Sequence, residues 1–352
     1  MRVVAVVVTF NRKDLLAECL DAIARQSVPV DEVVLVDNAS TDGTGDAVRD
    51  RPRVSYTRLD RNGGGAEGFH HGIRIALERD SDWLWLMDDD CDPAPDALER
   101  LLAARHATDP GTAVLAPVVK EPGGDVLPIN RGHVRPRWFF APLVAASPEE
   151  HAPGSETEIG FSSFVGPLLR TAAAREIGLP MSEMFIRFED VEYLQRLRPA
   201  RRMWLVGASE IVHKDPNPVA GSHFRAMWGD YAQPVPFAEQ WKRLYGFRNL
   251  IYTARKGGYG SAPRAFSQFA VQAVRTLLFH ERRARTLLLL AAYGLDGWRG
   301  RFRNVPPARW GELARTRRPL AFVSREALAY ESGSSPPAAN PEPAPSPATP
   351  RG

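Results

Sequence analysis

The chain has 352 residues, 44% of them hydrophobic, which suits one large domain with an appendage or two domains. A formal net charge of only +3 argues against a nucleic-acid-binding protein. The two cysteines, Cys19 and Cys91, provide neither a disulfide framework nor a metal-ligand spacing, as is typical of the cytosol. The apolar N-terminus is too short for a signal peptide, and no apolar run approaches the roughly 18 residues of a spanning helix. We therefore expect a cytoplasmic protein.

The first ninety residues alternate between apolar strand patterns and helical patterns. Strands are predicted at residues 2–9, 32–36, 54–59 and 83–87, with helices at 14–25 and from a glycine-rich loop to about residue 79. Asp14 is expected to cap the first helix. Strand–helix–strand order predicts a doubly wound, mostly parallel α/β sheet.

Three consecutive carboxylates, Asp88, Asp89 and Asp90, end the fourth strand abruptly. Ligands of open α/β sheets bind at the carboxyl ends of strands. Adjacent carboxylates repel each other when partly enclosed unless a cation neutralises them, and hard oxygen ligands suit Mg²⁺ or Mn²⁺. The alternative is a solvated acidic loop or a capped helix start.

Two other polar loops follow strands. Asp37 opens the loop 37–44 after the second strand, where a turn-forming role for its side chain is the alternative to ligand binding. Residues 62–68 form a glycine-rich loop before a helix, and such glycines let backbone N–H groups approach a phosphate or sugar. A plain turn is the alternative.

The next hundred residues contain a second acidic motif. We expect a helix at 93–102, a strand at 113–119, an irregular or hairpin insertion at 120–158, a strand and turn at 158–167, and a helix at 171–177. Glu189 and Asp190 then begin an amphipathic helix whose Val191, Leu194 and Leu197 face the core. A positioned carboxylate can accept the proton of an attacking hydroxyl, although acids at a helix start are usually structural. A short strand follows at 203–206 and leads to residues 211–215.

In this order, the segments 8–12, 36–44, 62–68 and 88–90 resemble family 2 inverting glycosyltransferases with the GT-A fold. The pattern of residues 185–193 resembles galactofuranosyl- and rhamnosyltransferases in particular. The resemblance covers about residues 2–303 and is strongest before residue 215.

The resemblance implies a role for each motif. Asp88 and Asp90 would hold a metal that grips the donor diphosphate, and His213 would complete that site, with sound coordination chemistry for Mn²⁺. Asp190 would be the general base and Glu189 its neighbour. The implied nucleotide-sugar contacts are Thr9, Arg12, Asp37, Asn62, Gly65 and Asp89, and Ser162, Ser163 and Phe164 would lie beside donor and acceptor.

The C-terminal region is predicted to be helical. Residues 265–279 carry an apolar stripe, and Arg282, Arg283 and Arg285 precede a further apolar run at 287–292. This pattern suits contact with an anionic membrane surface, and packing on the catalytic domain is the alternative. Segment 241–249 resembles a Tyr-Tyr-x-x-Arg-Asn element of the family, although Tyr245 and Phe247 do not align cleanly with it. Segment 292–301 resembles the family's closing Gly-x-x-Asp-Gly-x-x-Gly-Arg element.

We expect a GT-A catalytic domain at 1–235, with a nucleotide-binding half at 1–92 and an acceptor half at 93–235. A helical extension would occupy 236–330, and a disordered tail rich in Ser, Pro and Ala would occupy 331–352. The cluster Arg135, Arg137, Trp138, Phe139 and Phe140 is expected near the sugar-binding face, and the loop after His213 is expected to act as a lid.

The favoured function is transfer from UDP-galactofuranose to a hydroxyl of a glycan or lipid-linked glycan at the cytosolic face of a membrane. Transfer from dTDP-rhamnose is the alternative donor reading. Two other classes remain open: a nucleotidyltransferase, and a non-catalytic protein that binds sugar nucleotides. No nucleic-acid partner is expected.

Overall fold

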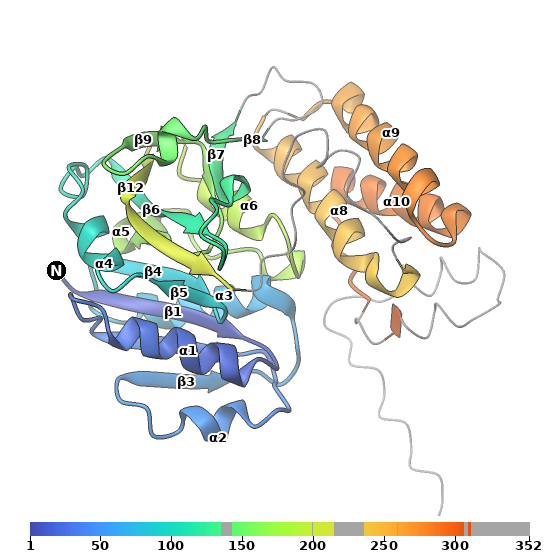
Figure 1. Cartoon of the computed structure of the whole chain (residues 1–352). Helices are drawn as coiled ribbons and strands as arrows, with labels where there is room; N and C mark the ends of the chain where they lie inside the picture. Colours follow the sequence, from blue (N-terminus) through green and yellow to red (C-terminus); the bar gives the residue numbers. More distant parts are fainter. Residues whose placement is uncertain (135–142, 199, 215–235, 259, 306–308, 311–352) are drawn as a thin grey trace, which may run out of the picture.

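The computed structural model describes residues 1–134, 143–198, 200–214, 236–258, 260–305 and 309–310 (Figure 1). The N-terminal part of the chain forms a central sheet with helices packed against it (Figure 1). Helices α8, α9 and α10 lie beside this sheet-containing part. The predicted loop after His213, the cluster at 135–140 and the C-terminal tail lie outside the described residues. No helix in the described ranges has the length and apolar character needed to cross a membrane.

Among the described residues, nine strands form the central sheet. Their order is β3 (Val54–Arg58), β2 (Glu32–Asp37), β1 (Val3–Thr9), β4 (Trp83–Asp88), β11 (Leu168–Arg170), β6 (Thr112–Lys120), β12 (Arg202–His213) and β5 (Cys91–Pro93), with β9 (Glu156–Ile159) also paired to β12. The run from β3 to β4 is parallel throughout, and β6 and β12 are also parallel. The predicted doubly wound, mostly parallel sheet is therefore confirmed.

Successive side chains of β1 point to opposite faces of the sheet, and all of them are buried. Both faces are therefore apolar, and helices cover each of them. Val3, Ala5 and Val7 pack in a core with α1 (Lys13–Ala24), α2 (Thr44–Val48) and α4 (Ala97–Leu102). Val4, Val6 and Val8 pack in a core with α3 (Gly64–Leu77), α5 (Thr171–Ile177) and α6 (Glu189–Gln195). The predicted core positions Val191, Leu194 and Leu197 are buried, and Leu194 and Leu197 belong to this second cluster.

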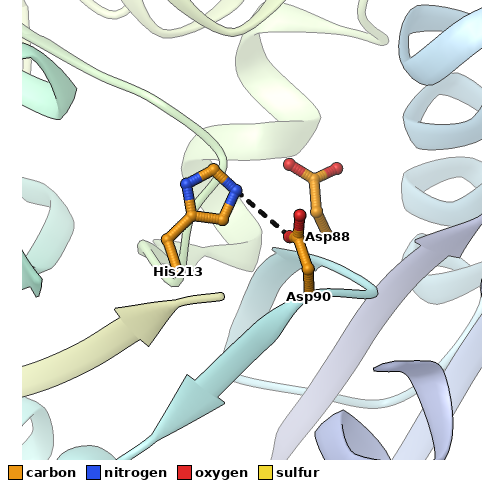
Figure 2. Close-up of side chains that lie close together, drawn as sticks. All are labelled: Asp88, Asp90 and His213. Carbon is orange, nitrogen blue, oxygen red and sulfur yellow. Dashed lines mark ion pairs between the residues drawn. The ribbon is translucent and has the colours of Figure 1, made fainter. Parts of the chain in front are cut away.

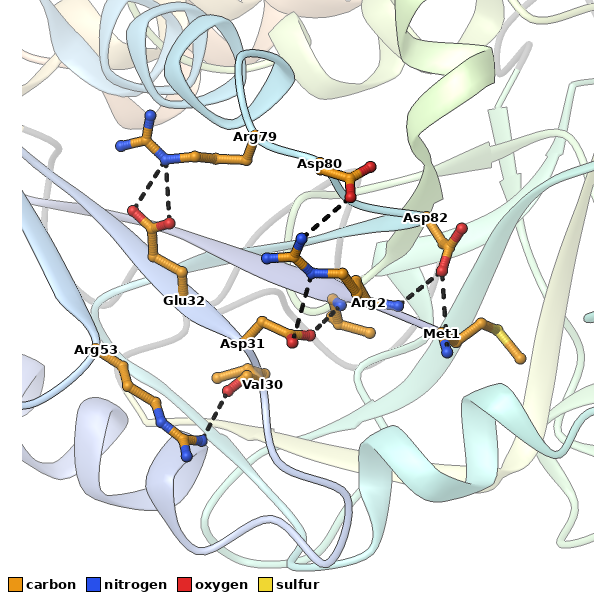
Figure 3. A network of polar contacts seen from close by, with 10 residues as sticks. Met1, Arg2, Val30, Asp31, Glu32, Arg53, Arg79, Asp80 and Asp82 are labelled. Atoms are coloured by element: carbon orange, nitrogen blue, oxygen red, sulfur yellow. Dashed lines mark hydrogen bonds and ion pairs between the residues drawn. The ribbon is translucent and has the colours of Figure 1, made fainter.

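The amino ends of the parallel strands are held by a polar network (Figure 3). The backbone N–H of Arg2 donates to Asp82 (2.7 Å), and that of Val3 donates to Asp31 (2.8 Å). Arg79, just after α3, donates through Nε to both carboxylate oxygens of Glu32 at 3.0 and 3.1 Å. These contacts fix the edge of the sheet opposite to the carboxyl ends, where the acidic residues lie.

Several local predictions were wrong. The first helix begins at Lys13 with Arg12 at the N-cap, so Asp14 lies in its first turn and does not cap it. The glycine-rich segment is helix from Gly64 onward. The segment after the Asp run forms β5 before α4 begins at Ala97, and β11, which is antiparallel to β4 and β6, was not expected.

The insertion at 120–158 is a hairpin-like arrangement in its described part. β7 (Arg131–Val134) pairs antiparallel with β8 (Leu143–Ala145) and with β10 (Phe161–Ser162). Short 3₁₀ turns, η1 (Pro128–Asn130) and η2 (Glu149–His151), flank these strands. The strand expected at 203–206 is longer, because β12 runs from Arg202 to His213 with a register shift between Val206 and Glu210.

The C-terminal helices have a core of their own. α8 (Trp241–Lys256) packs against α10 (Arg283–Arg299), and α9 (Ala262–Phe279) packs against α10; η4 (Phe237–Glu239) precedes α8. Their apolar cluster includes Tyr245, Leu290 and Tyr293, and Phe185 from the segment before α6 inserts into it. This insertion joins the helices to the acidic motif.

Candidate active site

The carboxyl ends of three neighbouring strands bring the predicted site residues together. Thr9 at the end of β1 is in register with Asp37 at the end of β2, and Val8 is in register with Asp88 at the end of β4. Each apolar strand gives way to a polar loop at the same edge of the sheet. This edge is where ligands of open α/β sheets bind.

Asp88, Asp90 and His213 form a cluster that suits a divalent cation (Figure 2). One ligand atom from each residue lies within 4.8 Å of the others. His213 Nε2 is 3.1 Å from Asp90 Oδ1, and this buried oxygen nevertheless has no hydrogen-bond partner. Two carboxylates and an imidazole whose ligand atoms converge are a donor set that suits a divalent cation, so a cation shared by the three side chains fits the residues present.

The electrostatics of this cluster point the same way. Burial and then the charge of Asp90 raise the pKa of Asp88 well above its ordinary range. Burial alone would raise the pKa of Asp90, but contacts with His213 and Arg12 outweigh it and lower that pKa. Burial would lower the pKa of His213, whereas the neighbouring carboxylates outweigh it and raise that pKa. Concentrated negative charge at a sheet edge favours a bound cation.

The structure pairs two of the predicted nucleotide-contact residues, Thr9 and Arg12, with the Asp run. Arg12 Nη1 donates to Asp90 Oδ2 at 2.7 Å and lies 3.6 Å from Asp89 Oδ1. Thr9 Oγ1 donates to Asp89 Oδ2 at 2.7 Å, and both side chains are buried. Asp89 therefore ties the end of β1 to the acidic loop, while Arg12 stays partly exposed at the rim.

Asp37 and Asn62 both take part in turns. Asp37 Oδ1 accepts from the backbone N–H of Ser40 (2.8 Å), and Asp37 Oδ2 accepts from the hydroxyl of Tyr56 (2.7 Å). Burial, followed by the hydrogen bond to Asp37, raises the pKa of that tyrosine. Asn62 Oδ1 accepts from the N–H of Gly64 at 2.8 Å. The turn-forming alternative for Asp37 is thus present in the geometry, and its neighbour Tyr56 was not among the residues predicted for the site.

The glycine-rich segment contacts the second acidic motif. A Cβ at Gly64, whose φ is +79°, would lie 2.0 Å from the carbonyl oxygen of Phe185. The backbone N–H of Ala66 donates to this same oxygen at 3.1 Å, and a Cβ at Gly65 would lie 3.2 Å from Glu189 Oε1. These glycines let the start of α3 meet the segment before α6, so the two motifs share one site.

Glu189 and Asp190 begin α6, as predicted, and their carboxyl groups resist ionisation. Burial raises the pKa of Asp190 to about 6, and backbone N–H groups of Val191 and Phe164 partly counter this rise. The Val191 N–H donates to Asp190 Oδ1 at 2.7 Å. Burial, and then the charge of Asp190, raise the pKa of Glu189 to about 8. Perturbed carboxyl pairs of this kind are typical of functional sites.

A buried arginine supports the Asp190 side of the site. Arg131 on β7 is fully buried and donates to the carbonyls of Pro117 (3.0 Å), Asn130 (2.9 Å) and Val165 (2.6 Å), and to Ser163 Oγ (3.1 Å). Burial lowers its pKa to about 9, and the nearby charge of Asp190 opposes that change. The sequence did not identify this residue, because a lone arginine after a turn usually reads as exposed.

Three further predicted residues, Ser162, Ser163 and Phe164, lie on the same side. Ser162 is buried and its hydroxyl donates to the carbonyl of Ser163 (2.9 Å). Ser163 Oγ donates to Asn130 Oδ1 at 2.8 Å. These serines hold the segment that presents the Phe164 N–H to Asp190, and their hydroxyls are engaged within the protein.

The mostly parallel sheet with helices on both faces is the GT-A fold of glycosyltransferases. The crystal structure of GalNAc-T7 with UDP, GalNAc and Mn²⁺ superposes with a TM-score of 0.54 at 13% identity, over 83% of this chain and 55% of that one. The crystal structure of S. aureus TarS 1-349 in complex with UDP superposes with a TM-score of 0.51 at 16% identity, over 93% and 88%. At these identities the likeness concerns the fold.

Sequence comparison identifies the family. Residues 4–158 match the family described as Glycosyl transferase family 2. Galactofuranosyltransferase GlfT1 of Mycolicibacterium smegmatis is 30% identical over 261 residues, which are 73% of this chain and 84% of that protein. The chain belongs to the family 2 glycosyltransferases and is an enzyme of this class.

Two further relatives are named as a galactofuranosyltransferase and a rhamnosyltransferase. Galactofuranosyltransferase GlfT1 of Mycobacterium tuberculosis is 38% identical over 207 residues, which are 55% of this chain and 64% of that protein. N-acetylglucosaminyl-diphospho-decaprenol L-rhamnosyltransferase of the same species is 27% identical over 226 residues, 56% of this chain and 73% of that protein. The family assignment decides against the nucleotidyltransferase and non-catalytic alternatives.

Proposed function

We propose that this enzyme transfers a galactofuranosyl group from UDP-galactofuranose to a hydroxyl of a glycan or lipid-linked glycan, with inversion at the anomeric carbon. The observation that carries the proposal is the cluster of Asp88, Asp90 and His213 at the carboxyl edge of the sheet, near enough to the Glu189–Asp190 pair that the charge of Glu189 contributes to the raised pKa of Asp88. The galactofuranosyltransferase relatives, at 30% and 38% identity, support the choice of donor.

Asp88, Asp90 and His213 would hold Mn²⁺ or Mg²⁺ in this proposal. When bound, the cation would offset the negative charge that develops on the departing diphosphate. Arg12, which contacts Asp90, would place a further positive charge beside the diphosphate. Thr9 and Asp89 would position the loop, and Asp37, Asn62 and Gly65 would line the nucleotide-sugar side.

Asp190 would accept the proton of the acceptor hydroxyl as that oxygen attacks the anomeric carbon. A base is most effective when its pKa lies near the working pH, and the raised value of about 6 suits this role. The backbone N–H of Val191 fixes one carboxylate oxygen. With a pKa of about 8, Glu189 would be protonated at neutral pH, so it would donate a hydrogen bond to a sugar oxygen and would not compete as a base.

The C-terminal helices would bring the enzyme to an anionic membrane surface. The apolar stripe of α9 divides into two parts: Phe269 and Ala273 pack against the core of the C-terminal helices, whereas others remain exposed. The exposed large apolar side chains of α9 and α10 are Phe266, Val274, Leu277, Leu278, Leu288 and Leu295. Together with the arginines at the start of α10, they suit a surface of anionic lipid and therefore a lipid-linked acceptor at the cytosolic face. The proposed division of the chain at residues 235/236 is supported by the separate apolar cluster of these helices.

Transfer from dTDP-rhamnose is the second candidate, and the 27% identical rhamnosyltransferase favours it. A thermal-shift comparison of UDP and dTDP, each with Mn²⁺ and with EDTA, distinguishes the two because a ligand that binds only the folded state raises Tm. We expect a Mn²⁺-dependent rise with UDP. A response to dTDP alone would favour rhamnosyl transfer, and no response to either would count against the proposal.

A further inference from the structure

The segment that leads into the acidic pair has an unusual backbone. Phe185 has φ 67° and ψ −63°, and the N–H of Ile186 donates to the carbonyl of Met184 at 2.9 Å, which makes a γ-turn of the rare positive-φ kind. Arg187 and Phe188 also have positive φ, at 69° and 67°. Residues other than glycine rarely adopt a positive φ, so this backbone conformation persists only where the surrounding structure imposes it.

Two adjacent residues of α8 supply most of these surroundings. Asn249 Nδ2 donates to the carbonyl oxygens of Met184 (3.0 Å), Ile186 (3.1 Å) and Arg187 (2.8 Å). Arg248 Nη2 also donates to the carbonyl of Met184, at 3.0 Å. Arg248 Nε donates to Asn249 Oδ1 at 3.0 Å, and both side chains are fully buried. Asn249 thus directs its amide nitrogen to the turn because its amide oxygen is already engaged.

The pair is itself held from the far side by the end of α10 and the segment after it. Arg248 Nη1 donates to the carbonyl of Arg303 (3.0 Å) and to Asn304 Oδ1 (2.9 Å). Asn304 Nδ2 in turn donates to the carbonyl of Glu183 at 3.0 Å. A Cβ at Gly297 would lie 2.2 Å from the carbonyl oxygen of Arg248, so α10 approaches α8 directly at this pair. One network therefore runs from the C-terminal helices to the turn.

We propose that Arg248 and Asn249 are positioning residues for the transfer reaction. They fix the carbonyls of Met184, Ile186 and Arg187, and the strained turn then sets where α6 starts and how Glu189 and Asp190 face the nucleotide edge. The C-terminal helices are on this account a part of the catalytic frame as well as a surface next to it. The role assigned to the pair rests on the proposed function, in which Asp190 is the base.

The test compares Asn249→Ala with Ile251→Ala in the full-length protein. Ile251 is a buried apolar residue of the same helix and belongs to the C-terminal core, so its truncation destabilises α8 without removing a donor from the turn. We expect Asn249→Ala to lower kcat with UDP-galactofuranose and an octyl glycoside acceptor by about 10²-fold, the effect of a misplacement of about 1 Å. The KM for the donor and the Mn²⁺-dependent binding of UDP should stay close to wild type, as should both activity and binding in Ile251→Ala.

Hydrogen exchange provides a second readout that does not depend on turnover. Asn249→Ala should speed hydrogen exchange of the backbone amides at residues 186–192. The increase should be larger than in Ile251→Ala when the two variants are compared at temperatures equally far below their Tm. Arg248→Lys should speed exchange of the same amides less than Asn249→Ala does. If the wild type is active and Asn249→Ala retains its kcat, the positioning role is wrong while the proposed function stands. The same conclusion follows if hydrogen exchange across the turn is unchanged in Asn249→Ala. A wild type without transferase activity would instead refute the proposed function.

Discussion

Replacement of Asp190 by asparagine should abolish transfer and, at alkaline pH, make the protein more stable. The pKa of Asp190 rises from an ordinary 3.8 to about 6, so the folded protein binds this proton more tightly than the unfolded chain does. Stability therefore falls as pH rises from about 4 through about 6. The difference corresponds to about 3 kcal/mol above pH 7, which is an upper value because the side chain is partly exposed.

The asparagine variant avoids this cost but loses part of the hydrogen bonding. Its amide has one acceptor oxygen where the carboxylate has two, which offsets about 1 kcal/mol of the gain from removing the charge. The net gain is then about 2 kcal/mol at pH 8, or a rise in Tm of about 4 °C. At pH 4 the wild-type carboxyl is protonated in the folded state, so the gain should nearly vanish.

Differential scanning calorimetry at pH 4 and pH 8 measures this difference, and the exposed Asp50→Asn variant serves as the control. Loss of the base should lower kcat by about 10²–10⁴-fold while Mn²⁺-dependent UDP binding persists. In the wild type, kcat should rise with pH through about 6 as Asp190 loses its proton. Turnover within tenfold of wild type, or a change in Tm that is independent of pH, would refute the reasoning.

Substitutions at the metal cluster, at Arg131 and on α9 have separate expected effects. His213→Ala should weaken UDP binding in Mn²⁺ by at least about tenfold, or about 1.4 kcal/mol, with little effect in EDTA. Titration calorimetry measures both affinities. Equal losses of affinity in Mn²⁺ and in EDTA would show that His213 is not a metal ligand. Arg131→Met should destabilise the fold by about 3 kcal/mol because it removes buried hydrogen bonds. It also removes the charge that lowers the pKa of Asp190, so the rising limb of the pH–kcat profile should move to higher pH. A rising limb at the wild-type pH would contradict this. Phe266→Ser with Leu277→Ser should reduce cosedimentation with phosphatidylglycerol vesicles, whereas Val126→Ser should not; equal binding by both would count against membrane contact.

The parts of the fold that follow local hydrophobic patterns could be predicted from the sequence. β1, β2 and β4 are continuous apolar runs that end in polar residues, so both the parallel sheet and the position of the Asp run were predictable. The start of α6 was predictable from its acidic first turn and the helical spacing of its apolar residues. His213 needed the family resemblance, because nothing local distinguishes a ligand histidine from a structural one.

The parts that depend on tertiary contacts could not be predicted. Helix α3 begins within glycines because its N-terminus meets the carbonyl of Phe185, a contact with a segment about 120 positions away. β11 has three residues and pairs with strands that are far away in sequence. Arg131 and Arg248 are fully buried by hydrogen bonds to distant carbonyls, and a sequence pattern gives arginine no sign of burial.

The positive-φ turn at Phe185, Arg187 and Phe188 was equally hidden, because none of these residues favours that conformation. The Arg-Asn element was visible as a resemblance, but its role became clear only from the contacts it makes with this turn. The residues that position the candidate base are thus the ones for which local sequence offers the least information.

The most direct test of the central claim is to incubate the enzyme with UDP-galactofuranose, Mn²⁺ and an octyl glycoside acceptor and to follow the products by NMR. The account predicts one UDP released for each new glycoside, an anomeric configuration opposite to that of the donor, and no product with Asp190→Asn. Product of retained configuration, or no product from the wild type while a dTDP-linked or other donor is consumed, would contradict it.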